Sequence, residues 1–130
     1  MENDRIRARE WFEKADHDFD AVNDILKGSG HPDVAGVLLQ QGVEKYLKGY
    51  LISKGWKLIK THDLKQLLDE AVKHNTLFDT YYDLLDMITE YYFEEKYPFG
   101  KTEVTLEEIK QNLKKVKKLI NLIKKDFGKK

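Results

Sequence analysis

The chain has 130 residues, of which 41% are hydrophobic, and it contains no cysteine. This length favours a single domain over residues 1–130, since folded units usually run to about 100 to 150 residues. The 23 basic and 23 acidic residues cancel, which excludes a globally cationic nucleic-acid-binding protein. The lack of cysteine excludes disulfides, thiolate metal sites and a cysteine nucleophile, and it fits a cytoplasmic protein.

No apolar run approaches the roughly 20 residues that a helix needs to cross a bilayer. The opening Met1-Glu2-Asn3-Asp4 is too polar and too acidic for a signal peptide. We therefore expect no membrane association.

Apolar residues recur at steps of three and four from Ala8 onward and predict a helix from about Asp4 to Lys27. A second helix, predicted from Pro32 to Lys54, is apolar around much of its circumference, which suits a central position in a bundle. Two glycines within it, Gly42 and Gly49, lie seven residues apart and share a face. Each costs about 1 kcal/mol in helix propensity relative to alanine, a cost that close contact with another helix could offset.

Thr61 is the predicted N-cap of a short third helix that ends near His74. A fourth helix is predicted to carry Phe78 and later apolar residues and to close before Pro98, where the Pro98–Lys101 stretch forms a loop.

The last helix is predicted to begin at a capping box formed by Thr105 and Glu108 and to continue to Phe127 with an unbroken apolar stripe. No segment shows the period-two alternation of a strand. These patterns predict an all-α fold, an up-and-down four-helix bundle with one additional short helix.

The sequence offers little for catalysis or metal binding. Neither a phosphate-binding glycine loop nor a nucleophile motif is present, and no two histidines have the spacing of a helical zinc site. His17 lies among Asp16, Asp18 and Asp20, but consecutive residues point around a helix, so a solvated acidic face is the better interpretation. We expect no catalytic residue, no metal and no cofactor.

A ligand-binding hypothesis rests on charged residues of the second helix. Glu44 and Lys48 are four residues apart, the favourable order for a helical ion pair worth roughly 0.2–0.5 kcal/mol. A purely structural role, in which the pair stabilises the helix, could explain these two residues. The functional alternative is that Lys45 or Lys48 reaches a phosphate across a groove, helped by Lys96 and by Tyr97 as a stacking surface for a base.

His62 follows the predicted cap residue, so its ring is expected at a helix start. The simpler interpretation is a locally hydrogen-bonded histidine that fixes the turn, and catalysis is the alternative. Together with Glu44, His62 is predicted to hold the shape of the groove.

The end of the chain is cationic, with nine lysines and a single acid, Asp126, between Lys110 and Lys130. A solvated face accounts for most of them. The more specific alternatives are that these lysines bind an RNA backbone or an acidic partner, such as the Asp83 to Glu95 region of a second copy.

Several landmarks together resemble the HEPN family of small helical domains. They are the Trp11–Phe19 stretch, the Gln41–Leu51 stretch, Thr61-His62-Asp63-Leu64 and the Tyr97-Pro98 step. The resemblance implies a helical bundle that commonly forms a homodimer and is often encoded beside a minimal nucleotidyltransferase. It also implies nucleotide or RNA binding and a role in toxin-antitoxin modules.

Many members of that family are metal-independent ribonucleases with an arginine and a histidine separated by four to six residues. Here the arginines are Arg5, Arg7 and Arg9, and His17 follows Arg9 only after seven intervening residues. The family's Arg-Tyr-Pro appears as Lys96-Tyr97-Pro98, without the planar fork that grips phosphate best. We therefore expect a non-catalytic accessory domain. A metal-independent endoribonuclease toxin and a purely structural dimerisation scaffold are the alternatives.

Overall fold

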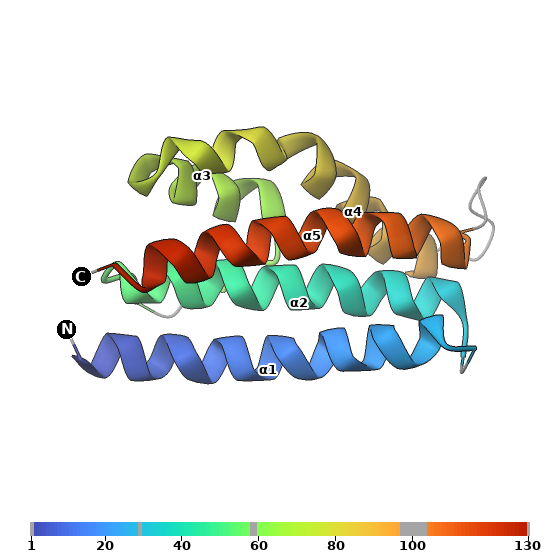
Figure 1. Cartoon of the computed structure of the whole chain (residues 1–130). Helices are drawn as coiled ribbons and strands as arrows, with labels where there is room; N and C mark the ends of the chain where they lie inside the picture. The colour runs from blue at the N-terminus through green and yellow to red at the C-terminus, as the bar shows by residue number, and fades with distance from the viewer. Residues whose placement is uncertain (1, 29, 58–59, 97–103, 130) are drawn as a thin grey trace.

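The computed structural model describes residues 2–28, 30–57, 60–96 and 104–129, without the side chains of residues 92–96. In chain order, these residues form α1 (Glu2–Leu26), α2 (Pro32–Ser53), α3 (Leu64–His74), the 3-10 helix η1 (Thr76–Tyr81), α4 (Tyr82–Lys96) and α5 (Leu106–Phe127). No strand occurs in the ranges given. The predicted all-α bundle with an additional short helix is confirmed (Figure 1).

Helix α2 is the centre of the bundle and contacts each of the other four α-helices. Figure 1 shows α1 along one side of it, α5 running beside it, and α3 and α4 on the side away from α1. Because α2 is apolar in nearly every direction, it can bury side chains against all of these neighbours at once. Tyr46, Leu47, Tyr50 and Leu51 are fully buried there.

Two glycines of α2 allow α1 to lie unusually close. A Cβ atom on Gly42 would be 2.7 Å from the ring of Phe19. A Cβ atom on Gly49 would be 2.7 Å from the ring of Phe12 and 3.0 Å from the carbonyl oxygen of Ala8. The expected compensation is confirmed, since aromatic rings of α1 occupy the space that side chains would need.

The start of α3 differs from the prediction. Asp63, not Thr61, is the N-cap, and its carboxylate accepts hydrogen bonds from the backbone amides of Lys65 and Gln66. The Thr61 hydroxyl instead accepts a hydrogen bond from the Asp63 amide at 3.1 Å. Both residue types cap helices, so the pattern alone did not decide between them.

The fourth helix also begins later in the chain than predicted. The Asn75 side chain accepts from the Leu77 amide at 3.0 Å, and the next residues form η1 with Phe78 buried, so the α-helix begins only at Tyr82. The Thr105 cap of α5 is confirmed, because its hydroxyl accepts from the Glu108 amide at 3.1 Å. The predicted Pro98–Lys101 loop lies outside the described residues.

At the end of the bundle that holds both termini, Asp126 joins three helices. Its carboxylate accepts hydrogen bonds from Lys54 Nζ and Asn75 Nδ2, each at 2.9 Å, and so links α5 to the ends of α2 and α3. Burial alone would raise the pKa of Asp126, but these hydrogen bonds outweigh it and hold the pKa below its ordinary value. The charged form therefore stabilises the folded state at neutral pH.

Within the ranges that the structure describes, no helix has both the length and the apolar composition needed to cross a bilayer.

The α1–α2 packing makes a testable prediction about Gly49. Gly49→Ala gains about 1 kcal/mol in helix propensity, but the new methyl group must displace a ring and a backbone carbonyl, an overpacking cost of about 3 kcal/mol. We expect a net loss of about 2 kcal/mol in the free energy of unfolding, measured with urea.

Gly128→Ala is the matched control, because its backbone has ordinary helical angles and the nearest atom to the new Cβ lies at 3.4 Å. This variant should be neutral. A Gly49→Ala protein as stable as the wild type would show that the close α1–α2 contact does not constrain the fold.

Candidate ligand-binding groove

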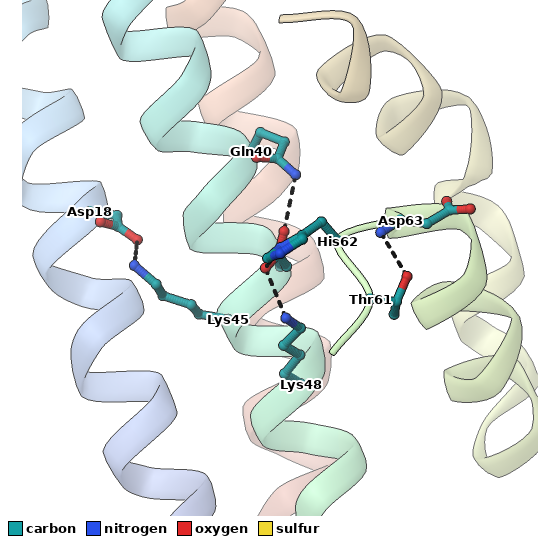
Figure 2. A network of polar contacts seen from close by, with 8 residues as sticks. Asp18, Gln40, Lys45, Lys48, Thr61, His62 and Asp63 are labelled. Carbon is teal, nitrogen blue, oxygen red and sulfur yellow. Dashed lines mark hydrogen bonds and ion pairs between the residues drawn. The ribbon is translucent and has the colours of Figure 1, made fainter. Parts of the chain in front are cut away.

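A cavity of about 700 Å³ lies between α2, the turn before α3, and α4. Polar side chains from all three segments line it: Gln40, Gln41, Glu44, Lys45, His62, Asp63 and Thr89. Figure 2 shows several of these residues and the contacts between them. We call this cavity the α2 groove.

The buried carboxylate of Glu44 organises one wall of the groove. It accepts hydrogen bonds from Gln40 Nε2 at 3.3 Å and Lys48 Nζ at 3.0 Å, and it lies 2.9 Å from His62 Nδ1. Gln40, Glu44 and Lys48 follow one another at steps of four along α2 and therefore share one face of the helix. A buried charge is tolerated only with such partners. Through Glu44, the side chains of Gln40, Lys48 and His62 form one connected network.

Lys48 is held within this network. Its side chain is only 5% exposed, its ammonium group pairs with Glu44, and it lies 5.8 Å from the centre of the Trp11 ring. Lys48 is not among the described residues that line the groove. To contact a phosphate there, its ammonium group would have to leave Glu44, and this assignment stays a prediction.

Lys45 lies at the edge of the groove and is 28% exposed. Its ammonium group is 2.7 Å from the Asp18 carboxylate of α1, as Figure 2 shows. Of the lysines predicted to bind a ligand, the two on α2 are therefore both paired with carboxylates of the same chain.

His62 is the most exposed polar group of the network. Its side chain is 79% exposed, and among the described residues only Nδ1 has a partner, the buried Glu44 carboxylate. The cap at Asp63 holds the backbone next to it, so the ring is fixed at one nitrogen and open at the other. The structure thus brings Glu44 and His62 together at the groove, and their role in holding its shape stays a prediction.

The remaining predicted contacts cannot be placed against this wall. Lys96 is the last residue of α4, but its side chain lies outside the described part of the chain, as does all of Tyr97. Both stay predictions.

The acidic cluster around His17 has partners of its own. Asp16 accepts from the Tyr46 hydroxyl at 2.5 Å, and Asp18 pairs with Lys45. Burial, together with the hydrogen bond to Asp16, raises the pKa of the Tyr46 hydroxyl, which therefore stays a donor. In the described ranges, no three histidine, aspartate or glutamate side chains are grouped so that they could hold a metal ion.

A family model described as HEPN domain matches residues 8–126, which is nearly the whole chain. The chain belongs to the HEPN domain family. No curated protein and no solved structure matches it. All four segments that carry the resemblance, from Trp11 to the Tyr97-Pro98 step, lie inside the matched region of this HEPN domain.

Two contact partners of the groove residues were not predicted. The step of four from Gln40 to Glu44 is visible in the sequence and could have suggested the amide as a partner. Asp18, in contrast, lies 27 residues before Lys45 and meets it only because α1 and α2 pack together.

The network predicts strong coupling between Glu44 and Lys48. Glu44→Gln removes the countercharge of a buried ammonium group and should cost about 3 kcal/mol in the free energy of unfolding. Adding Lys48→Met should restore part of that loss, because the unpaired charge is then gone. Urea unfolding of both single variants and the double variant measures the coupling.

Glu70→Gln is the control, since it breaks the Lys73–Glu70 pair, whose lysine is 68% exposed. It should cost about 0.5 kcal/mol or less. Additive effects of the Glu44 and Lys48 substitutions would contradict a buried, connected network.

Proposed function

We propose that this HEPN domain is a non-catalytic accessory domain that binds a nucleotide or a segment of RNA in the α2 groove. The observation that carries the proposal is the groove itself. Its volume of about 700 Å³ falls in the usual range of about 300–1,000 Å³ for small-molecule sites. Its wall combines amide, carboxylate, ammonium, hydroxyl and imidazole groups.

These groups can contact both the base and the phosphate of a nucleotide. Amides such as those of Gln40 and Gln41 can donate to and accept from the edge of a base. The exposed ring of His62 offers a surface on which a base can stack. Lys45 and Lys48, with Lys96 and Tyr97 beyond the described side chains, remain the proposed further contacts.

Membership of the HEPN family supports a second part of the proposal. The domain works beside a minimal nucleotidyltransferase in the cytoplasm, in a module of the toxin-antitoxin type. The missing arginine–histidine spacing argues that its contribution is binding, not RNA cleavage.

The binding proposal is tested by filling the groove. Gln41→Trp places an indole in the cavity and should weaken binding of nucleoside phosphates and of short single-stranded RNA at least ten-fold, because the ligand and the indole compete for the same space. Isothermal titration calorimetry with the full chain measures both ligand types.

Gln111→Trp is the matched control, because Gln111 is exposed on α5 and does not line the groove. It should bind like the wild type. Equal affinities for Gln41→Trp and wild type would place the site elsewhere, and no binding of either ligand to the wild type would refute the proposal.

We further propose that the domain forms a homodimer through α1 and α5. The support comes from a smaller groove of about 240 Å³ between these helices. Apolar side chains from both helices form its floor: Phe19, Leu113, Val116 and Ile120.

Exposed stripes of opposite charge run along the two helices, and Asp16, Lys117 and Lys124 from these stripes line the smaller groove. On α1 they are acidic, at Glu13, Asp16, Asp20 and Asp24, and on α5 they are basic, at Lys110, Lys114, Lys117 and Lys124. The α1 stripe follows steps of three and four and the α5 stripe follows steps of four, three and seven, so each occupies one helix face. None of these α5 lysines forms an ion pair within the described part of the chain, which leaves the basic stripe available to a partner.

The opposite charges of the two stripes select one symmetric arrangement. Helix α1 starts and α5 ends at the same end of the bundle, so the two run antiparallel (Figure 1). A two-fold axis along the groove places α1 of one copy over α5 of the other, acidic stripe against basic stripe. An axis across the helices would place like charges opposite each other, which is unfavourable.

Charge reversal tests this interface. Asp20→Lys and Lys117→Glu should each weaken the dimer about ten-fold, because each sets like charges against each other, and the double variant should regain affinity by exchanging the two signs. Sedimentation velocity at low ionic strength measures the dissociation constant.

Lys65→Glu, which changes an exposed charge on α3, is the control and should leave the dimer unchanged. A wild-type chain that sediments as a monomer at all concentrations would refute the dimer. A dimer that is insensitive to all these reversals would refute this face.

A further inference from the structure

The charges of the α2 groove are balanced before any ligand binds. Lys45 is paired with Asp18, and Lys48 is paired with Glu44. Asp63 adds a negative charge at the same wall. An anionic phosphate therefore meets no unpaired ammonium group among the described lining residues, although a phosphate needs positive charge or several hydrogen-bond donors to be held.

His62 is the group of this wall that can change its charge when a phosphate arrives. An imidazole becomes positive by taking up one proton, and both ring nitrogens then donate hydrogen bonds. Its Nδ1 lies 2.9 Å from Glu44, and the described residues provide no partner for Nε2. The 79% exposure of the side chain leaves Nε2 accessible to a ligand.

Two carboxylates lie next to the His62 ring. Glu44 of α2 touches it directly, and Asp63 follows it in the same turn. On α2, the positive charges of Lys45 and Lys48 are each offset by a carboxylate. Thr89, which α4 contributes to the groove wall, carries no charge. Lys60 and Lys65 lie two residues before and three residues after His62 in the chain, so the described charges near the ring are of both signs, and the carboxylate of Glu44 is the one in direct contact with it.

We infer that His62 is the phosphate subsite of the α2 groove, and that a phosphate group binds at Nε2 together with the uptake of one proton. Glu44 then stabilises the imidazolium through Nδ1–H while Nε2–H donates to a phosphate oxygen. This inference rests on the proposed function of the groove. It names the chemistry shared by the two possible ligands, the phosphate of a free nucleotide and the phosphodiester of RNA.

Counting protons on binding tests the inference. Titration calorimetry is performed with the full chain at one pH in two buffers of different ionisation enthalpy, with AMP and with a short single-stranded RNA lacking terminal phosphates. Wild type should take up more protons than His62→Gln, with a difference of up to one per site, for whichever probe binds. His62→Gln should bind about ten-fold more weakly, because its amide can donate a hydrogen bond but cannot become charged.

Two controls define what the proton count means. His31→Gln changes an exposed histidine that does not line the groove, and it should take up protons like the wild type. Adenosine, which has no phosphate, should bind without the His62-dependent uptake. Comparing each variant with the same ligand removes the protonation of AMP itself from the difference.

Each outcome bears on a separate statement. Equal proton uptake by wild type and His62→Gln would overturn the phosphate subsite and leave the groove proposal standing. Failure of the wild type to bind either probe would overturn the groove proposal and the subsite together. Should His62→Gln bind too weakly to measure, ¹⁵N resonances of the wild-type His62 ring at fixed pH decide the question. They should move toward the doubly protonated form on adding the ligand, and unmoved resonances would overturn the subsite.

Discussion

A carboxylate buried on the central helix needs partners, and the requirement of Glu44 for them determines the form of the candidate site. Its environment on α2 is apolar on most sides and its side chain is only 10% exposed, so water solvates the charge poorly. Lys48 supplies a countercharge, and Gln40 and His62 supply hydrogen bonds. Because His62 belongs to the segment before α3, satisfying Glu44 also attaches that segment to α2.

This attachment depends on packing elsewhere in the bundle. Trp11 of α1 lies beside the Lys48 ammonium group, and Asp18 of α1 holds Lys45. Both contacts require α1 to lie close to α2, which the two glycines of α2 allow. The Asp126 cluster then fixes the far end of α2 to α3 and α5. The polar wall of the groove is therefore a product of close helix packing, although none of these glycines lies in the wall.

The sequence predicted what short-range periodicity controls. Helix positions, the central role of α2, the Thr105 cap and the pairing of Glu44 with Lys48 follow from spacings of three and four, and the structure agrees with each. The predicted N-cap of α3 was wrong because Thr61 and Asp63 are both suitable caps. The choice between them depends on how the whole turn packs against α2. The 3-10 segment before α4 was missed for a related reason, since Phe78 fits a helical stripe in either conformation. The burial of Lys48 and the Asp18 contact depend on where α1 lies, which no spacing within α2 encodes.

The ion pairs also change how the predicted site residues should be weighed. Lysines at helical spacing suggest phosphate contacts when they are free. A lysine that is already paired with a carboxylate must give up that ion pair to bind a phosphate, so it contributes only the difference between the two interaction free energies. For Lys48, which is nearly inaccessible, leaving Glu44 would also unbalance a buried carboxylate. Lys45 is more exposed and can exchange Asp18 for a ligand at smaller cost. In the proposed binding of an anionic ligand to this groove, attraction would therefore come from groups that can gain charge or change partners, so His62 and Lys45 matter more than the total number of lysines.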